Sequence, residues 1–393
     1  MAGKHAVLSP SSASRWVACP PSARLNEKLI ERFGDAGSPF AEEGTKAHEL
    51  GEIKLRKANG EINDFVYRKR RETLGDIPKE MEDATDFYAE TVLGKLFTLR
   101  RTDPGARLYI EQRLDMTNWV PGCFGTGDAI LVSDSILEVC DLKYGKGVPV
   151  SAVGNKQARL YGLGGVQAFQ ALFSFHTVRN TIIQPRLDSV TEETMSLQQL
   201  LEWGEEIRPV AKLAWEGKGV FLPGDHCRFC KAKAICSARV AEAMKIFEQG
   251  ASDVATIPDE QIPDILAHLD TFEAWAKDLR SYALSQAMRG VQFKGYILTH
   301  GRRPGRKWKN QEEVVDQLSR AGLTEKEYMK TELRSPSEIE KLMGKTGFNA
   351  VLSDLVYQGD GKLELMPEDC GRVAYDPAEL AFADLAEGGA NGE

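Results

Sequence analysis

Residues 125–161, GTGDAILVSDSILEVCDLKYGKGVPVSAVGNKQARLY, decide the fold of this chain. They contain two short runs rich in isoleucine, leucine and valine, joined by Asp134-Ser135, which is the pattern of a β-hairpin. If that pair forms the turn, residues that face each other across the hairpin have numbers that sum to 269. Asp128 is therefore predicted to lie directly opposite Asp141.

This pairing would place two carboxylates and a lysine together. Cross-strand partners have Cβ atoms about 5 Å apart and alternate residues share a face, so Lys143 joins Asp128 and Asp141. Facing like charges destabilise a hairpin unless a positive charge lies between them. Mg²⁺ or Mn²⁺ suits such oxygen ligands, and a lysine beside a metal-bound water suits phosphodiester hydrolysis. The alternative is a solvated hairpin with ordinary surface charges.

Composition limits the class of protein. A chain of 393 residues with 42% hydrophobic and 27% charged residues has room for two or three soluble domains. No apolar run reaches membrane length and the N-terminus lacks a signal-peptide core, so we expect a cytoplasmic protein with no membrane partner. The net charge of −8 argues against a protein that coats nucleic acid. The pattern G-x-x-x-x-G-K-[ST] is absent, which excludes this type of ATP-binding motor.

The segments before the hairpin are predicted to be a helix and a strand. The helix covers residues 40–58, opens at Gly44-Thr45 and carries His48 in its first turns. A lone helical histidine is more often structural than a ligand. The strand covers residues 106–116 and contains Glu111, either a framework charge or an outer partner of the site.

The segments after the hairpin complete a βββαβα-like order. A helix over residues 155–175 places Gln157 and Tyr161 on one face. A strand over residues 181–187 and a helix over 194–216 follow. This order predicts an α/β fold with a mixed central sheet flanked by helices.

Three of the seven cysteines lie close together in the C-x₂-C-x₅-C pattern of Cys227, Cys230 and Cys236. Such compact spacing lets three thiolates converge on one ion or cluster. His226 could complete a Cys₃His zinc site, or Cys19 could complete a Cys₄ iron–sulfur site. A metal site is favoured over a disulfide framework because the compartment is reducing.

The chain beyond residue 245 has a different composition. We expect a helical or α+β domain over residues 246–375, with a hairpin in LVYQGDGKLELMP that turns at Gly359-Asp360-Gly361. The acidic tail, 376–393, is expected to be frayed.

A short basic patch within this region surrounds an aromatic residue. Cations interleaved with an aromatic ring suit a nucleic-acid backbone and a stacked base, and the alternative is a solvated turn. The candidate DNA-binding residues are Arg302, Arg303, Arg306, Lys307 and Trp308.

Together these motifs resemble the RecB/AddB-type nucleases of the PD-(D/E)XK superfamily. The resemblance is to the iron–sulfur branch, which includes the AddB nuclease domain and the CRISPR-associated adaptation exonucleases, and it covers residues 9–240. It implies a restriction-endonuclease-like core within a domain of residues 1–245. The matching motifs, in the family's order, are Gly44-Thr45-x-x-His48, Gly125-x-x-Asp128, Asp141-Leu142-Lys143 and Gln157-x-x-x-Tyr161.

The resemblance implies a role for each motif. His48, Asp128, Asp141 and the Leu142 carbonyl would bind Mg²⁺ or Mn²⁺, and Lys143 would orient or activate the attacking water. Asp141 is a departure, since the family often has glutamate there.

The same resemblance implies roles for the following helix. Gln157 and Tyr161 would support the lysine and contact DNA, and Lys156 and Arg159 add positive charge nearby.

The cysteines match the same branch. Cys19 precedes the catalytic motifs, while Cys227, Cys230 and Cys236 follow them. In that family the four residues hold a 4Fe–4S cluster that joins the two ends of the nuclease domain. Zinc is the alternative cofactor.

The function implied is a free-standing, metal-dependent DNA exonuclease, similar to proteins encoded by phages and prophages and serving recombination or end processing. Its partners would be DNA with a free end or a single strand, and a phage recombination or single-strand-binding protein. The rival interpretation is a non-catalytic DNA-binding accessory protein that keeps the fold and the cysteine site.

Overall fold

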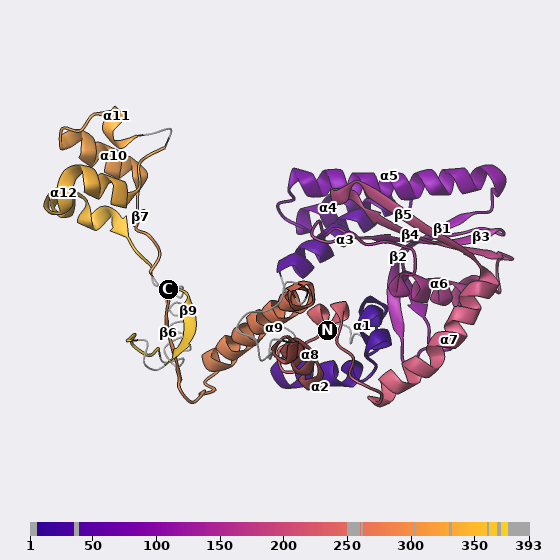
Figure 1. The fold of residues 1–393 in the computed structure, drawn as a ribbon. Helices are drawn as coiled ribbons and strands as arrows, with labels where there is room; N and C mark the ends of the chain where they lie inside the picture. The colour runs from indigo at the N-terminus through magenta and orange to yellow at the C-terminus, as the bar shows by residue number, and fades with distance from the viewer. Residues whose placement is uncertain are drawn as a thin grey trace, which may run out of the picture. The chain divides into compact units, whose positions relative to one another are not determined.

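The computed structural model describes residues 6–34, 39–249, 260, 262–301, 303–329, 332–359, 361–367 and 371–375. The chain divides into two compact units, Met1–Thr271 and Phe272–Glu393 (Figure 1). The domain end expected at residue 245 falls within helix α8 (Ser237–Gln249). The acidic tail, 376–393, lies outside the described residues.

The first unit is built on one mixed sheet. Its five strands lie in the order β1-β2-β3-β4-β5, and only β3 and β4 pair in parallel. The predicted α/β class, with a mixed sheet and flanking helices, is confirmed. The strands are β1 (Arg107–Asp115), β2 (Phe124–Val132), β3 (Ile136–Leu142), β4 (Thr177–Gln184) and β5 (Ser189–Ser196).

The β2–β3 hairpin has the predicted register. Ala129 pairs with Cys140 and Val132 with Leu137, so facing residues have numbers that sum to 269. The Ser133 amide donates to the Ile136 carbonyl at 2.9 Å and closes the turn. Every residue of β3 is buried, as expected for a central strand covered on both faces.

Alternate residues of β2 enter two different cores. Ile130 and Val132 pack with the helices α6 (Lys156–Phe169) and α7 (Leu197–Glu216). Ala129 and Leu131 pack with α5 (Lys79–Thr102). This division follows from the two-residue period of a strand. The sheet is therefore a layer between two groups of helices.

The remaining helices of this unit lie before β1 or after α7. Among them, α3 (Pro39–Ala58) packs against α5, and α2 packs against α7. No described helix is long and apolar enough to cross a membrane. The bounds of the other helices before β1 are Ala13–Ala18 for α1, Ser22–Phe33 for α2 and Asp64–Thr73 for α4.

Two local expectations in this unit were wrong. Helix α3 begins at Pro39, so Gly44-Thr45 lies inside the helix rather than at its start. Residues 194–196 belong to strand β5 rather than to the following helix. Strand β5 alternates between exposed and half-buried residues, as an edge strand does, and its polar composition concealed it.

The second unit contains two small two-stranded sheets and a helical core. Strand β6 (Tyr296–His300) pairs with β9 (Leu363–Pro367), and β7 (Lys307–Trp308) pairs with β8 (Val356–Tyr357). The predicted hairpin between residues 355 and 367 was wrong, because its two strands join different sheets.

The helices of the second unit follow the long helix α9 (Ile262–Met288), within which the division between the units falls. A small hydrophobic core joins α10 (Gln311–Arg320), α11 (Glu325–Tyr328) and α12 (Pro336–Leu352). Helix α12 is kinked at Gly344, whose φ of 72° is left-handed.

Candidate metal centre

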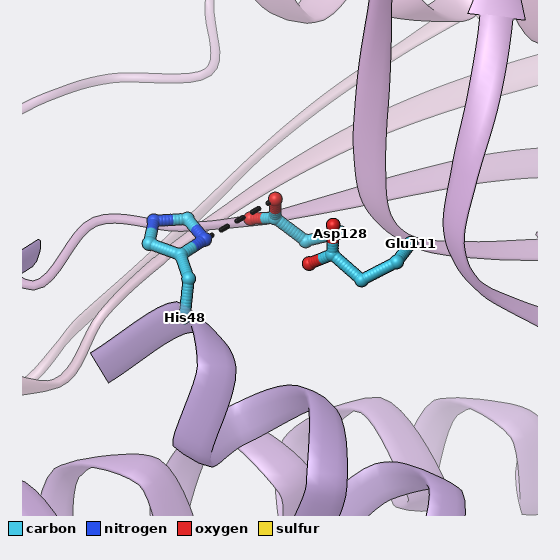
Figure 2. A group of neighbouring side chains, drawn as sticks. All are labelled: His48, Glu111 and Asp128. Carbon is cyan, nitrogen blue, oxygen red and sulfur yellow. Dashed lines mark ion pairs between the residues drawn. The ribbon is translucent and has the colours of Figure 1, made fainter. Parts of the chain in front are cut away.

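Three side chains from three different elements meet at the open end of the β2–β3 hairpin. His48 comes from α3, Glu111 from β1 and Asp128 from β2 (Figure 2). One ligand atom from each lies within 4.8 Å of the others, and His48 Nδ1 is 3.3 Å from Asp128 Oδ1. One imidazole and two carboxylates are a donor set that divalent ions such as Mn²⁺ and Mg²⁺ accept.

Asp128 is held in place by the neighbouring strand. Its Oδ2 accepts a hydrogen bond of 2.7 Å from the Leu142 amide, which leaves Oδ1 directed to His48. Burial raises the pKa of Asp128, but the charge of His48, that of Lys143 and the Leu142 amide together lower it below its ordinary value. Asp128 is therefore an ionised and oriented donor. The Leu142 amide thus orients Asp128. That the Leu142 carbonyl binds the metal stays a prediction.

A second group combines Asp141 of β3, Lys143 directly after that strand and Gln157 of α6. Lys143 Nζ is 2.7 Å from Asp141 Oδ2 and donates to Gln157 Oε1 at 3.2 Å. Gln157 Nε2 donates to Asp141 Oδ1 at 3.2 Å, which closes a triangle of contacts. Burial lowers the pKa of Lys143, but the charges of Asp141 and Asp128 raise it above the ordinary value. Lys143 is thus a fixed cation at neutral pH.

Asp141 faces the same region but is bound to the lysine. Burial and the charge of Asp128 raise the pKa of Asp141, against the opposing effect of Lys143. Asp141 does not join the close group of ligand atoms formed by His48, Glu111 and Asp128 among the described residues. Its role as a metal ligand stays a prediction.

Tyr161 lies in the hydrophobic core rather than at the surface. Its ring packs against the start of β2, where a Cβ on Gly125 would lie 2.9 Å from Tyr161 Cε1. Burial raises the pKa of the Tyr161 hydroxyl, and a hydrogen bond with Gln157 opposes the shift. Because Gly125 has no side chain, the Tyr161 ring can pack against it and hydrogen-bond to Gln157. The predicted motifs Gly125-x-x-Asp128 and Gln157-x-x-x-Tyr161 are therefore in contact.

Glu111 was not identified as a ligand from the sequence. The β1–β2 register pairs Ile110 with Ala129 and Gln112 with Gly127, so Glu111 occupies the position opposite Asp128. Its φ of 51° is left-handed, a conformation that costs a residue with a Cβ on the order of 1 kcal/mol. Backbone strain and a perturbed carboxyl pKa in one residue are typical of a functional site.

Two of the three candidate metal ligands, His48 and Glu111, have perturbed pKa values. Burial lowers the pKa of His48, but the carboxylates of Asp128 and Asp141 raise it to about 9. Burial and the charges of Asp128 and Glu52 raise the pKa of Glu111 to about 7. A metal ion would have to displace the His48 proton, so metal binding and proton release are linked.

Tyr88 of α5 lies behind the same group. Its ring packs against α3, where a Cβ on Gly51 would lie 3.1 Å from Tyr88 Cδ1. The hydroxyl is buried and accepts or donates no hydrogen bond among the described residues. Burial, followed by the charge of Asp128, raises its pKa well above the ordinary value. Tyr88 is a neutral phenol beside the carboxylates.

The four predicted cysteine ligands line one small pocket. Cys19 follows α1, whereas Cys227, Cys230 and Cys236 follow α7, so the pocket brings together residues far apart in the sequence. The cluster itself stays a prediction. His226, the alternative fourth ligand, also lines the pocket. No three of these ligand atoms lie within 4.8 Å of one another among the described residues. That spacing is wider than a single zinc ion requires, since Zn–S bonds are about 2.3 Å.

The surroundings of this pocket suit anionic sulfur. Asn26 Nδ2 donates to Cys230 Sγ at 3.2 Å. Burial lowers the pKa of Arg15, and the charges that oppose this effect are those of Cys230 and Cys19. The guanidinium and the N–H donor are neighbours that favour bound iron or zinc, whereas burial raises the pKa of Cys227 in the metal-free protein.

Of the two candidate DNA-binding residues of the first unit, Arg159 already interacts with other side chains of the protein. Arg159 Nε donates to Glu193 Oε2 at 2.9 Å, and its guanidinium also lies over the Trp203 ring. Lys156 is the first residue of α6, and its charge acts on His226.

Two residues of the basic patch, Trp308 and Arg306, pack within the second unit. Trp308 packs against Phe348, and its Nε1 donates to the Arg334 carbonyl at 2.9 Å. Arg306 forms an ion pair with Glu340. Lys307 and Arg303 are exposed, and Arg302 lies outside the described residues.

Comparison with known proteins gives a family and a distant structural match. Residues 5–373 match the family model described as "Protein of unknown function (DUF2800)". Among solved structures, "Crystal structure of SSO0001" is 17% identical over 55% of this chain and 94% of that chain, with a TM-score of 0.22. That score does not establish a common fold.

Proposed function

We propose a function from the site itself, because the chain belongs to the DUF2800 family, whose description assigns none. The proposal is a metal-dependent deoxyribonuclease with a PD-(D/E)XK core that acts on DNA ends in recombination or end processing. One observation carries it. Oxygen and imidazole donors for a divalent ion gather beside a fixed lysine cation at one end of the β2–β3 hairpin.

The donor set fits Mg²⁺ or Mn²⁺. His48, Glu111 and Asp128 would hold the ion. Asp141 of β3 is near enough for its charge to act on His48. A bound ion would acidify an attacking water and stabilise negative charge on the phosphate. The strained, partly buried Glu111 supports this assignment, since its pKa stays raised to about 7 although the charges of His48 and Arg56 act on it.

The protein's own residues would position the reactants. Lys143 is a cation that would stabilise charge as it develops on the scissile phosphate and orient the nucleophile. Gln157 holds Lys143 and Asp141 together through its amide, so both are fixed before the substrate binds. Asp128 is fixed by the Leu142 amide. Preorganised charges of this kind are the largest contribution in many enzymes.

The cysteine pocket is proposed to hold a 4Fe–4S cluster. Cys19, Cys227, Cys230 and Cys236 would hold it and join the start of the unit to its end. A single zinc ion completed by His226, whose Nε2 lies 3.9 Å from Cys227 Sγ, is the alternative.

The test is a cleavage assay on end-labelled single- and double-stranded DNA with Mn²⁺, Mg²⁺ or EDTA. We expect cleavage with either metal, none in EDTA, and a loss of at least about 10³-fold for Lys143→Ala and Asp128→Asn. Lys146→Ala is the matched control, since this exposed lysine lies three residues away and pairs with Glu80. Thermal unfolding checks that each variant is folded.

Full cleavage by folded Lys143→Ala would exclude the catalytic assignment. Metal-independent binding without cleavage by the wild type would instead indicate the DNA-binding accessory protein. Blocking the 5′ or 3′ end of the substrate then separates exonuclease from endonuclease action.

A further inference from the structure

We propose that the outward face of α4 binds single-stranded DNA and delivers it to the metal centre. This inference rests on the proposed function, because it names the form of DNA that the site receives. Helix α4 covers Asp64–Thr73, DFVYRKRRET, and contains four consecutive basic residues. None of its residues is buried.

The helix is well formed although it is exposed. Asn63 caps its N-terminus by accepting a hydrogen bond of 3.0 Å from the Val66 amide. Lys57 of α3 pairs with Asp64 at 2.8 Å and lies over the Tyr67 ring. The acidic charge at the start of α4 is thereby compensated from within the unit, and the helix is attached to α3.

One side of α4 is held by ion pairs to α3, the helix that carries His48, and to α5. Arg70 forms a two-point contact with Glu52, at 3.0 and 3.1 Å. Glu52 lies one turn after His48 on α3, and its charge contributes to the raised pKa of Glu111. Arg71 forms an ion pair with Glu82 of α5. Two of the four cations therefore hold the helix beside the site.

The side chains on the other side of α4 are exposed and form no ion pair among the described residues. Phe65 is 73% exposed, and Arg68 and Lys69, three and four residues later, share its face. Neither Arg68 nor Lys69 forms an ion pair with any described residue. The charge of Arg68 acts on Asp64, one turn earlier, which already pairs with Lys57. A large exposed ring beside two cations that form no ion pair is an unusual surface in a chain with a net charge of −8.

Single-stranded DNA matches this surface in both respects. Its phosphates would pair with Arg68 and Lys69, and an unpaired base would stack on Phe65. Duplex DNA would meet the cations but hides its base faces, so Phe65 would have no partner. The charge and the ring together favour a single strand.

A similar pair of residues elsewhere provides a matched control. Phe97 of α5 is 68% exposed, and Arg101 lies four residues later on the same helix. That end of α5 lies at the hairpin turn, where Asp103 accepts a hydrogen bond from the Asp134 amide at 2.8 Å. The metal centre lies at the opposite end of the hairpin.

The experiment measures binding of fluorescein-labelled oligothymidylate by fluorescence anisotropy in EDTA, where no cleavage occurs. The variant Phe65→Ala/Arg68→Ala/Lys69→Ala should raise Kd at least about tenfold, since one stacked base alone contributes about 1–3 kcal/mol. The dependence of log Kd on log salt should become shallower by about 1.4, because each of the two cations that neutralises a phosphate contributes about 0.7 to the slope. Phe97→Ala/Arg101→Ala should bind as the wild type does.

Unchanged affinity of the α4 variant, or equal weakening in the control, would overturn the proposal. So would a preference of the α4 face for duplex DNA, RNA or an acidic protein. The outcomes also separate the two proposals. A wild type that cleaves DNA while the α4 variant binds normally refutes only the docking face. A wild type that binds through α4 but never cleaves refutes only the nuclease.

Discussion

Replacing Glu111 with glutamine should stabilise the metal-free protein while weakening its response to metal. The folded-state pKa of Glu111 is about 7, against an ordinary value of 4.5. The folded state therefore binds more protons than the unfolded state between these values. The stability due to neutral Glu111 is greatest below pH 4.5 and is lost as the pH rises through 7.

The magnitude follows from the shift. A difference of about 2.5 pKa units, each worth 1.36 kcal/mol, gives on the order of 3 kcal/mol of destabilisation at alkaline pH. Glutamine keeps the size and the backbone strain of Glu111 but carries no charge. We therefore expect metal-free Glu111→Gln to be more stable than the wild type by up to about 3 kcal/mol at about pH 8.5, and the difference to shrink at about pH 5.

Metal should reverse this order. An ion that binds only the folded protein at about 1,000 times its Kd adds about 4.1 kcal/mol to the wild type, which exceeds the difference of about 3 kcal/mol, and Glu111→Gln should gain much less. Urea unfolding in EDTA and in Mn²⁺, at both pH values, measures all four stabilities. Glu90→Gln, on the exposed side of α5, controls for loss of a surface charge. A Glu111→Gln protein that is less stable than the wild type in EDTA at both pH values would show that Glu111 is a structural residue and refute the reasoning.

Three further changes test other parts of the structure. Cys19→Ser should abolish the visible absorbance expected of anaerobically purified protein, and a colourless wild type containing stoichiometric zinc would contradict the cluster. Gly125→Ala should lower the free energy of unfolding by about 1–3 kcal/mol, because its Cβ would lie 2.9 Å from Tyr161 Cε1, and an unchanged urea midpoint would contradict that packing. Tyr88→Phe removes a buried hydroxyl without a partner among the described residues, so the metal-free protein should gain up to about 1–3 kcal/mol; a loss of stability in urea unfolding would indicate a hydrogen bond that the structure lacks.

The sequence by itself determined the features whose causes are local. The β2–β3 register follows from Asp134-Ser135, because a tight turn fixes which residues pair. The same applies to Gln157 and Tyr161, whose spacing places them on one face of α6.

The tertiary structure decided the features that depend on distant segments. Glu111 reaches Asp128 only because β1 pairs with β2 across residues 116–123, a connection with no short turn from which the register could be deduced. The same holds in the second unit. The sequence around Gly359 has the pattern of a hairpin, but its two strands, β8 and β9, pair with β7 and β6 instead of with each other. Pairing of distant strands depends on the burial of whole faces, which no local pattern records, whereas turns and helix faces are set by neighbouring residues.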